Sequence, residues 1–200
     1  MGVKKVTRPA VFLDRDGVLN PLVQNLATGR MESPLTPGDL RLADGVIPAL
    51  HRLQKAGYPL ILVSNQPNYA LGKSSLDTLG AIHDKLAAEL IFGGVHFARF
   101  SYCLHHPRGV IPGYSGLCIC RKPSPWFLLR ARDDFGFSLR ECWMIGDQPT
   151  DTQCGRAAGA RTIRVDSGYL APAGKHAPAA DFFVGHLAQA VAIILDHKPS

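Results

Sequence analysis

The chain has 200 residues, a mass of 21.6 kDa and a formal net charge of +6 with neutral histidines. This length suits one α/β domain, or one domain with a small insert, and excludes a peptide whose fold depends on disulfides. Apolar residues make up 46%, but no run approaches the roughly 18 apolar residues of a membrane-spanning helix, so we expect a soluble protein. The positive charge favours anionic partners without distinguishing nucleic acids from small phosphates.

The amino-terminal segment passes from a short basic stretch into an apolar run of four or five residues, which is too short for a signal peptide. We therefore expect a cytoplasmic protein. The chain has five cysteines, an odd number. In a reducing compartment, closely spaced cysteines are more often metal ligands than disulfide partners.

Short apolar runs alternate with segments of helical pattern along the chain. Because strands that are apolar on both faces alternate with helices in parallel sheets, the pattern predicts a doubly wound α/β fold. The predicted strands are 10–13, 60–63, 95–102, 142–145 and 161–165, and the predicted helices are 46–56, 74–92, 124–135 and 151–158.

Three segments fall outside this alternation. Residues 21–44 are rich in proline, glycine and asparagine and predict a loop or a small hairpin after the first strand. Residues 103–120 carry most of the cysteines, and residues 171–180 predict a surface loop before a final strand and helix. Without a repeat or a low-complexity tract, we expect a single domain over residues 1–200 with an insert at residues 103–120.

Two carboxylates follow the first predicted strand. Asp14 ends the apolar run, Asp16 lies two residues later, and Gly17 allows a sharp turn beside a ligand. Ligands in open parallel sheets bind beyond the carboxyl ends of the strands, so this position suits a site. A short acidic motif of this kind also occurs in ordinary polar loops, so it is weak alone.

A second acidic pair follows the strand at 142–145. Asp147 comes after Gly146, and Asp151 lies at the start of the next helix, where a negative charge also complements the helix dipole. Together with Asp14 and Asp16 these carboxylates would repel one another unless a divalent cation lay among them. Oxygen ligands suit Mg²⁺, so we expect a magnesium ion here.

Donors for a phosphate lie between these two acidic motifs. Ser64, Asn65 and Gln66 end the strand at 60–63, and Arg121 and Lys122 precede a predicted helix. A serine hydroxyl and a lysine can hold phosphoryl oxygens and neutralise their charge. Each residue alone is as often a turn residue or a solvated side chain.

Cys103 and His105, followed by Cys118 and Cys120, form two pairs with the spacing of metal ligands. Three thiolates and one imidazole satisfy a closed tetrahedral zinc site, which would keep the loop between the pairs ordered. His106 is the competing imidazole, and His105 is preferred because it completes the pair with Cys103. We expect Cys142 and Cys154 to be ordinary buried residues.

The order of these motifs resembles the haloacid dehalogenase (HAD) phosphatase superfamily. The four motifs are Asp14 with Asp16, then Ser64, then Lys122, then Gly146-Asp147 with Asp151. The resemblance implies a HAD-like, Rossmannoid sheet with little or no cap.

The resemblance also implies a mechanism. Asp14 is the implied nucleophile that forms an aspartyl-phosphate, and Asp16 is the implied acid and base. Magnesium would be held by Asp14, the Asp16 backbone carbonyl and Asp147, with Asp151 in support. Ser64 and Lys122 would hold the phosphoryl group.

The zinc loop and its flanking motifs resemble one branch of this superfamily, the heptose 1,7-bisphosphate phosphatases, near the histidinol-phosphate phosphatases. The resemblance implies an enzyme that removes the 7-phosphate of a heptose 1,7-bisphosphate, a small phosphorylated sugar. Loops 20–35, 64–73 and 103–121 would determine which substrate is accepted. Because no oligomer seam stands out, we expect a monomer. The expected substrate-binding residues are Asn20, Asn65, Gln66, Lys73 and Arg121.

The sequence departs from that branch around the site. The loop from Pro67 to Lys73, the uncharged segment after Asn20, and Gln148 in place of a common lysine alter the expected substrate contacts. Such changes affect the identity of the substrate more than the phosphoryl chemistry.

Three other functions use the same residues. A phosphatase for histidinol phosphate or another small sugar phosphate would differ in the rim loops. A phosphatase acting on 3′ ends of nucleic acid would show a strong salt dependence. A zinc-clamped module without catalysis is disfavoured, because basic residues are dispersed and aromatic residues are only 8%. We therefore expect neither a nucleic-acid nor a membrane partner.

Overall fold

The computed structural model describes residues 9–26, 28–169 and 179–197. The central sheet contains β1 (Val11–Leu13), β4 (Leu60–Asn65), β5 (Arg99–Cys103), β6 (Trp143–Gly146), β7 (Arg161–Val165) and β8 (Phe182–Val184). Its strand order is β5-β4-β1-β6-β7-β8, and every neighbouring pair is parallel. Because β1 lies between β4 and β6, the carboxyl ends of these three strands meet at one edge. The predicted doubly wound α/β fold is confirmed.

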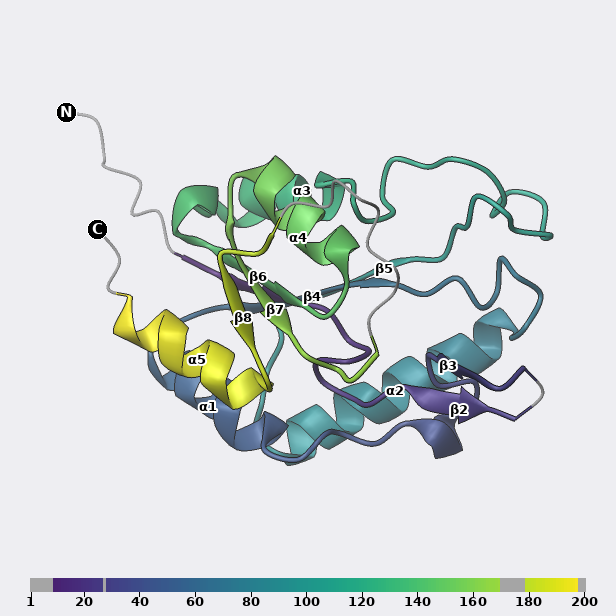
Figure 1. Ribbon diagram of the computed structural model, residues 1–200, viewed down its shortest axis with the longest axis horizontal. Coiled ribbons are helices and arrows are strands. Elements are labelled where there is room, and N and C mark those ends of the chain that lie inside the picture. The colour runs from purple at the N-terminus through teal and green to yellow at the C-terminus, as the bar shows by residue number, and fades with distance from the viewer. Residues whose placement is uncertain (1–8, 27, 170–178, 198–200) are drawn as a thin grey trace.

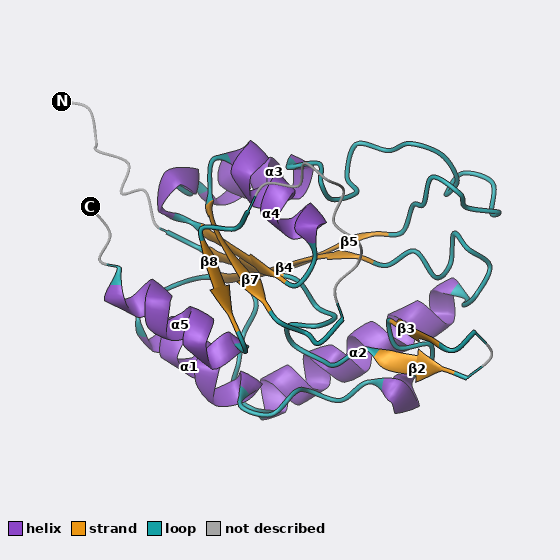
Figure 2. Ribbon diagram, in the orientation of Figure 1, coloured by secondary structure: helices purple, strands orange, loops and turns teal. Residues whose placement is uncertain are grey.

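Helices cover both faces of this sheet (Figure 1). They are α1 (Val46–Lys55), α2 (Leu76–Phe92), α3 (Trp126–Phe135), α4 (Pro149–Ala158) and α5 (Leu187–Asp196). Helices α1, α2 and α5 lie on one face, and α3 and α4 on the other (Figure 2). Two short 3₁₀ helices, Pro37–Asp39 and Leu139–Glu141, lie in connections.

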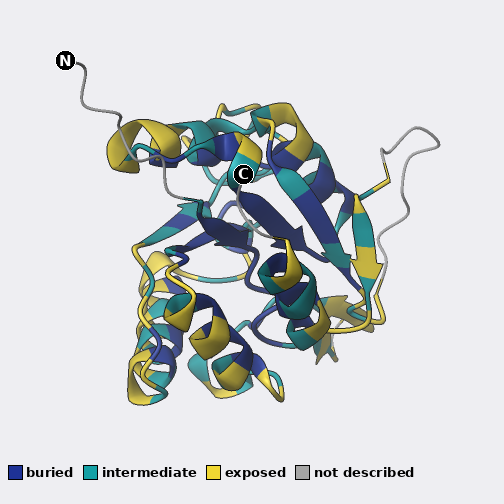
Figure 3. Ribbon diagram, turned by 90° about the vertical axis from the view of Figure 1, so that its left-hand side faces the viewer, coloured by how far each residue is buried: buried dark blue, intermediate teal, exposed yellow. Residues whose placement is uncertain are grey.

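The sheet is buried on both faces because β1 and β6 carry no polar side chain and β4 is apolar over its first four residues. Along β1, Val11 and Leu13 pack into the core under α1, α2 and α5, whereas Phe12 packs into the smaller core under α3 and α4. All three are fully buried. Figure 3 shows this layering, with the buried strands between helices whose outer faces are exposed. The site is therefore carried by strands that cannot shift without opening both cores.

The ends of α2 explain one difference from the prediction. Ser75 caps its first turn by accepting a hydrogen bond from the Thr78 backbone N–H at 3.0 Å. At its end, the Val95 N–H donates to the Leu90 carbonyl, so Val95 belongs to the helix terminus. The strand predicted at 95–102 is therefore wrong in its first part, since pairing with β4 begins at Arg99.

The segment after β1 forms the predicted hairpin, with β2 (Val23–Asn25) antiparallel to β3 (Arg30–Glu32). The final strand and helix are also present as β8 and α5. The surface loop predicted at 171–180 lies outside the described residues except for its last two. Cys142 and Cys154 are fully buried, as expected. In the part of the chain described, no helix has the length and apolar character needed to cross a bilayer.

Two glycines in helices offer a matched test of packing. A Cβ added at Gly155 in α4 would lie 2.7 Å from Thr162 Cγ2 and 2.8 Å from Met144 Cβ, so the helix could not stay at its present distance from the sheet. We expect Gly155→Ala to lower the free energy of unfolding by about 1–3 kcal/mol. Gly80→Ala in α2 meets no heavy atom within 4 Å and should raise it by about 0.5–1 kcal/mol. Urea unfolding followed by circular dichroism measures both, and changes of the same sign would contradict this packing.

Candidate active site

The predicted acidic and basic residues meet at the carboxyl edge of the sheet. Asp14 follows β1, Asp147 follows β6, and Lys122 lies just before α3. Each of these side chains is buried, with at most 7% of its residue surface exposed. The clustering follows from the topology, because β1 and β6 are paired neighbours.

A buried lysine links two of the aspartates. The Lys122 ammonium lies 2.9 Å from Asp14 Oδ1 and 2.6 Å from Asp151 Oδ1. Its remaining hydrogen bond goes to the Val63 carbonyl at 2.8 Å. Burial would lower the pKa of Lys122, but the two carboxylates raise it overall, so the lysine stays charged. These contacts hold the positive charge of Lys122 in a fixed position beside Asp14.

The backbone of Lys122 is also fixed. Its N–H donates to Asn65 Oδ1 at 3.0 Å, and its carbonyl accepts from Asn65 Nδ2 at 3.1 Å. Asn65 is the last residue of β4, so this exchange joins the loop before α3 to the sheet edge. The position of the ammonium therefore depends on β4 as well as on the aspartates.

Asp16 is held by donors on both of its oxygens. Arg15 Nε donates to Oδ1 at 3.0 Å and Arg15 Nη2 to Oδ2 at 3.2 Å. Asn20 Nδ2 donates to Oδ1 at 2.9 Å, and Gln66 Nε2 to Oδ2 at 2.6 Å. Burial opposes ionisation, but the Arg15 charge and these hydrogen bonds lower the pKa of Asp16. We call this set of three donor residues the Asp16 clamp.

Ser64 lies beneath the same network, because its hydroxyl accepts from Gln66 Nε2 at 3.0 Å. Ser64, Asn20 and Gln66 are each no more than 2% exposed. The structure thus places Asn20 and Gln66, both predicted to bind substrate, behind Asp16. Their direct contact with substrate stays a prediction.

Asp147 is a carboxylate with one oxygen available to a cation. Its Oδ2 accepts from Gln148 Nε2 at 2.5 Å and from Ser167 Oγ at 2.9 Å. Its Oδ1 is buried and makes no hydrogen bond to any described residue. Gly17, at a positive φ of 78°, passes so close that a Cβ there would lie 2.5 Å from Oδ2. Only a glycine leaves room for this carboxylate.

The carboxylates fit a divalent cation. One oxygen from each of Asp14, Asp147 and Asp151 lies within 4.8 Å of the others. Burial first, and then the neighbouring carboxylates, raise the pKa of Asp147 to about 7. Burial likewise raises the pKa of Asp151 to about 6 although Lys122 opposes it. Hard oxygen ligands suit Mg²⁺, and a bound Mg²⁺ ion would relieve the repulsion between these carboxylates.

A cleft of about 440 Å³ opens above this cluster. Its floor includes Asp14, Asp16, Lys122 and Asp147. Most of its wall residues come from the three loops predicted to shape the substrate site, and the others follow β6 and β7. The residues that complete its walls are Leu22, Arg30, Met31, Glu32, Ser33, Asn65, Pro67, Asn68, Leu71, Lys73, His106, Arg121, Gln148, Thr150 and Tyr169.

Several wall residues were missed at the level of sequence. Glu32 and Arg30 come from the β2–β3 hairpin, and the Glu32 carboxylate accepts from Lys73 Nζ at 2.7 and 2.8 Å. The predicted substrate residue Lys73 is thus already paired across the mouth of the cleft. Tyr169, after β7, also reaches the cleft. No local sequence motif predicts that these residues line the cleft, because their positions depend on how the loops pack over the edge of the sheet.

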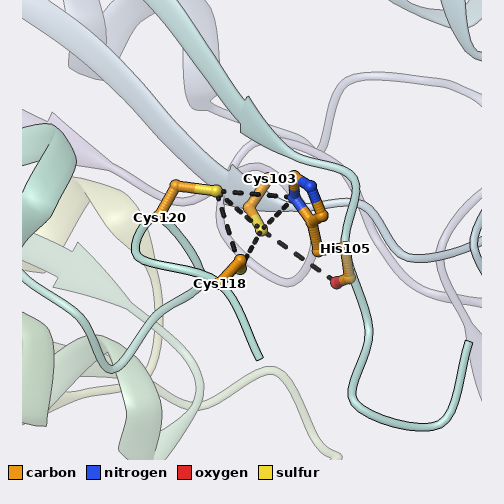
Figure 4. A group of neighbouring side chains, drawn as sticks. All are labelled: Cys103, His105, Cys118 and Cys120. Carbon is orange, nitrogen blue, oxygen red and sulfur yellow. Dashed lines mark hydrogen bonds between the residues drawn. The ribbon is translucent and has the colours of Figure 1, made fainter. Parts of the chain in front are cut away.

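The cysteine and histidine pairs converge on one another (Figure 4). Cys120 Sγ lies 3.3 Å from Cys103 Sγ, 3.7 Å from Cys118 Sγ and 3.6 Å from His105 Nδ1. Cys103 Sγ lies 3.6 Å from Cys118 Sγ and 3.8 Å from His105 Nδ1. A tetrahedral zinc ion with ordinary bond lengths requires ligand separations of about 3.6–3.8 Å. Four of the five separations match this range, and the Cys120–Cys103 separation is shorter, so the cluster would fit zinc with a small adjustment of these two thiols.

The loop that carries these residues is tied to the cleft. Arg121 Nη1 donates to the His105 carbonyl at 3.0 Å, and the Val110 N–H donates to the Ala70 carbonyl at 2.6 Å. His105 points into the cluster, whereas His106 lines the cleft. The arrangement places Arg121 and His106 at the substrate side of the loop.

Fold and site define a phosphatase of the HAD type. Residues 119–190 match a family model described as HAD-hydrolase-like. The chain is 36% identical to the D-glycero-beta-D-manno-heptose-1,7-bisphosphate 7-phosphatase of Vibrio cholerae over 157 residues, covering 78% of this chain and 80% of that protein. It is also 36% identical to the D-glycero-D-manno-heptose-1,7-bisphosphate 7-phosphatase of Thermosynechococcus vestitus over 201 residues, covering 95% and 97%.

Solved structures of HAD phosphatases also resemble this chain. The D,D-heptose 1,7-bisphosphate phosphatase of B. bronchiseptica, complexed with magnesium and phosphate, superposes with a TM-score of 0.76 and 26% identity over 94% of this chain and 99% of that chain. A HAD-like phosphatase from Mesorhizobium loti superposes with a TM-score of 0.77 and 27% identity over 97% and 89%. The chain belongs to the heptose-1,7-bisphosphate phosphatase family of HAD hydrolases.

The pKa of Asp147 predicts how magnesium affinity depends on pH. Its folded-state value of about 7 exceeds the ordinary 3.8, so without metal the folded protein keeps this proton up to near neutrality and loses stability as pH rises from about 4 to 7. Because a metal ligand must be ionised, binding releases the proton. We expect Mg²⁺ affinity to rise between about pH 6 and 8, by up to about tenfold per unit for one proton.

Titration calorimetry in buffers of different ionisation heat measures this proton release directly. Asp147→Asn should bind Mg²⁺ weakly and show no such release, whereas Asp84→Asn, at an exposed position on α2, should behave as the unaltered protein. Affinity that is constant across this pH range would contradict the raised pKa.

Proposed function

We propose that this enzyme removes the 7-phosphate of D-glycero-D-manno-heptose 1,7-bisphosphate in a magnesium-dependent reaction. The observation that carries the reaction type is the buried contact between Lys122 and Asp14 beside the unpaired oxygen of Asp147. The relatives named for this substrate, one of them matching along nearly the whole chain, support the substrate class.

In the first step, an Asp14 carboxylate oxygen attacks phosphorus. A bond forms between that oxygen and phosphorus, the ester bond to the sugar oxygen breaks, and an aspartyl-phosphate results. Lys122 remains beside Asp14 and offsets the negative charge carried by the transferred phosphoryl group. Mg²⁺, held by Asp14, the Asp16 backbone carbonyl and Asp147 with Asp151 in support, would neutralise further charge on the phosphoryl oxygens.

Asp16 acts twice in this proposal. It gives a proton to the departing sugar oxygen, and it then takes a proton from the water that hydrolyses the aspartyl-phosphate. The clamp favours the ionised form, which the second step uses. The incoming phosphoryl group is negative and raises the pKa of a nearby carboxyl, which favours the protonated form that the first step uses.

The cleft walls are the proposed substrate contacts. Arg121 and His106 lie on the zinc-loop side, and the Lys73–Glu32 pair lies on the hairpin side. Charged side chains of both signs suit a ligand that carries phosphate and hydroxyl groups together. Asn65 lines the cleft while it holds Lys122, so it connects the rim to the reacting centre.

We also propose that the cysteine and histidine cluster holds a structural zinc ion. Three thiols and an imidazole leave no open position for water, so the ion would act by fixing the loop beside Arg121 and Lys122. The expected cytoplasmic location, monomeric state and single domain stay predictions.

The substrate is tested by phosphate release with and without Mg²⁺. The panel holds both anomers of heptose 1,7-bisphosphate, histidinol phosphate, simple sugar phosphates and a 3′-phosphorylated oligonucleotide. We expect the highest kcat/KM for the heptose bisphosphate. A higher kcat/KM for another compound would mean that this compound is the substrate, with the mechanism unchanged. Phosphate release that does not depend on Mg²⁺ would contradict the mechanism.

Asp14→Asn tests the nucleophile. The amide cannot form the phosphoryl ester, so we expect kcat to fall by at least about a thousandfold, with the fold retained by circular dichroism. Asp84→Asn, the same substitution at an exposed position on α2, is the matched control. Turnover of Asp14→Asn close to that of the control would mean that another group attacks phosphorus.

Cys118→Ser tests the zinc ion. We expect the purified protein to hold one zinc per chain by plasma emission spectrometry, and the variant to lose it together with about 2 kcal/mol of stability, roughly 4–8 °C in Tm. Ser115→Ala, exposed in the same loop, should keep both. If the unaltered protein contains no zinc, and Cys118→Ser has the same Tm, the cluster does not hold a structural zinc ion.

A further inference from the structure

A second pocket lies on the other side of the Asp16 clamp. It has a volume of about 330 Å³ and opens between α2 and the edge strand β5. Its walls are largely apolar, formed by Leu76, Leu79, Phe100 and Leu104. This volume falls within the usual range of small-molecule sites, about 300–1,000 Å³.

The polar residues at its base belong to the clamp. Arg15 and Gln66 line the pocket, and they are 1% and 2% exposed. Arg15 Nη2 donates to Gln66 Oε1 at 2.7 Å, so the two side chains hold each other as well as Asp16. A molecule in this pocket would therefore touch the back of the residues that orient Asp16, without entering the substrate cleft.

The charge of the pocket selects an uncharged ligand. Arg15 is neutralised by Asp16 at 3.0 Å, and His83 shares a hydrogen bond of 3.0 Å with the Tyr102 hydroxyl. Arg15, His83 and Tyr102 are the titratable residues among the described ones that line the pocket. A charged ligand would lose its hydration without gaining an unpaired counter-charge.

The shape of one wall favours a ring. The His83 ring lies 4.9 Å from the Phe100 ring and 5.5 Å from the Tyr102 ring, in edge-on contacts. Aromatic walls of this kind pack against flat ligands by offset or edge-on stacking.

Gly80 keeps the pocket open. It lies inside α2, where glycine costs about 1 kcal/mol relative to alanine. Neither a positive φ nor a close neighbour requires glycine there, since a Cβ would meet no heavy atom within 4 Å. Gly80 lines the pocket, so a large side chain at this position would occupy it.

We propose that this pocket binds a small uncharged aromatic molecule bearing a hydroxyl or carbonyl oxygen, and that its binding inhibits the enzyme. The oxygen accepts hydrogen bonds from Arg15 or Gln66 in competition with Asp16. Asp16 then loses the orientation that both of its steps need, and turnover falls. The inhibition rests on the proposed function, whereas the binding does not.

Binding is tested with 2-naphthol as probe and the methyl resonances of Leu79 and Leu104 as readout. We expect saturable shifts at both methyl groups, little effect of the charged 2-naphthoate, and at least tenfold weaker binding to Gly80→Leu. Gly80→Ala should bind within about twofold of the unaltered chain. No saturable shift, or equal binding by Gly80→Leu, would overturn the site. So would shifts that depend on protein concentration and coincide with dimers in sedimentation velocity, because a second copy would then fill the groove.

Inhibition is tested by Mg²⁺-dependent phosphate release. At saturating 2-naphthol we expect kcat to fall at least threefold with KM changed less, and Gly80→Leu to be insensitive. A rise in KM with kcat unchanged would mean that the probe competes with substrate in the cleft, which overturns the proposal. Binding that leaves kcat unchanged overturns the inhibition. Because the methyl shifts need no turnover, loss of the proposed phosphatase activity remains distinguishable from loss of the pocket.

Discussion

The buried contact of Lys122 with Asp14 and Asp151 is the interaction on which the site depends. Removing any one partner would leave a charge in the interior with too little compensation, which is costly. Its formation requires β1, β6 and the loop before α3 to meet at one edge, and the parallel sheet brings them there. The same contact that satisfies the buried charges also places a cation beside the carboxylate that attacks phosphorus in the proposed mechanism.

Two layers of support surround this centre. Asn65 fixes the backbone of Lys122, and the loop that carries the cysteine and histidine cluster fixes the segment just before it. On the other side, Arg15 and Gln66 fix Asp16 and form the base of a second pocket. Side chains held by several hydrogen bonds are preorganised, so the proposed reaction would need little rearrangement when charge develops on the substrate.

The rim is built differently from the centre. The hairpin β2–β3 reaches over the cleft and pairs with the loop after β4 through the contact of Glu32 with Lys73. Both side chains lie near the surface, where such a pair contributes little stability. Its effect is instead on the charge and shape of the cleft mouth, which the proposed function assigns to substrate contact.

The sequence alone determined the doubly wound fold and the chemical centre, because buried strands and acidic strand ends follow from local patterns. The spacing of the three cysteines and the histidine indicated their cluster for the same reason. Tertiary structure decided what no spacing encodes: that Asn20 and Gln66 turn behind Asp16, and that Glu32 reaches Lys73. These contacts join segments far apart in the chain, and their geometry is set by how loops pack on the finished sheet.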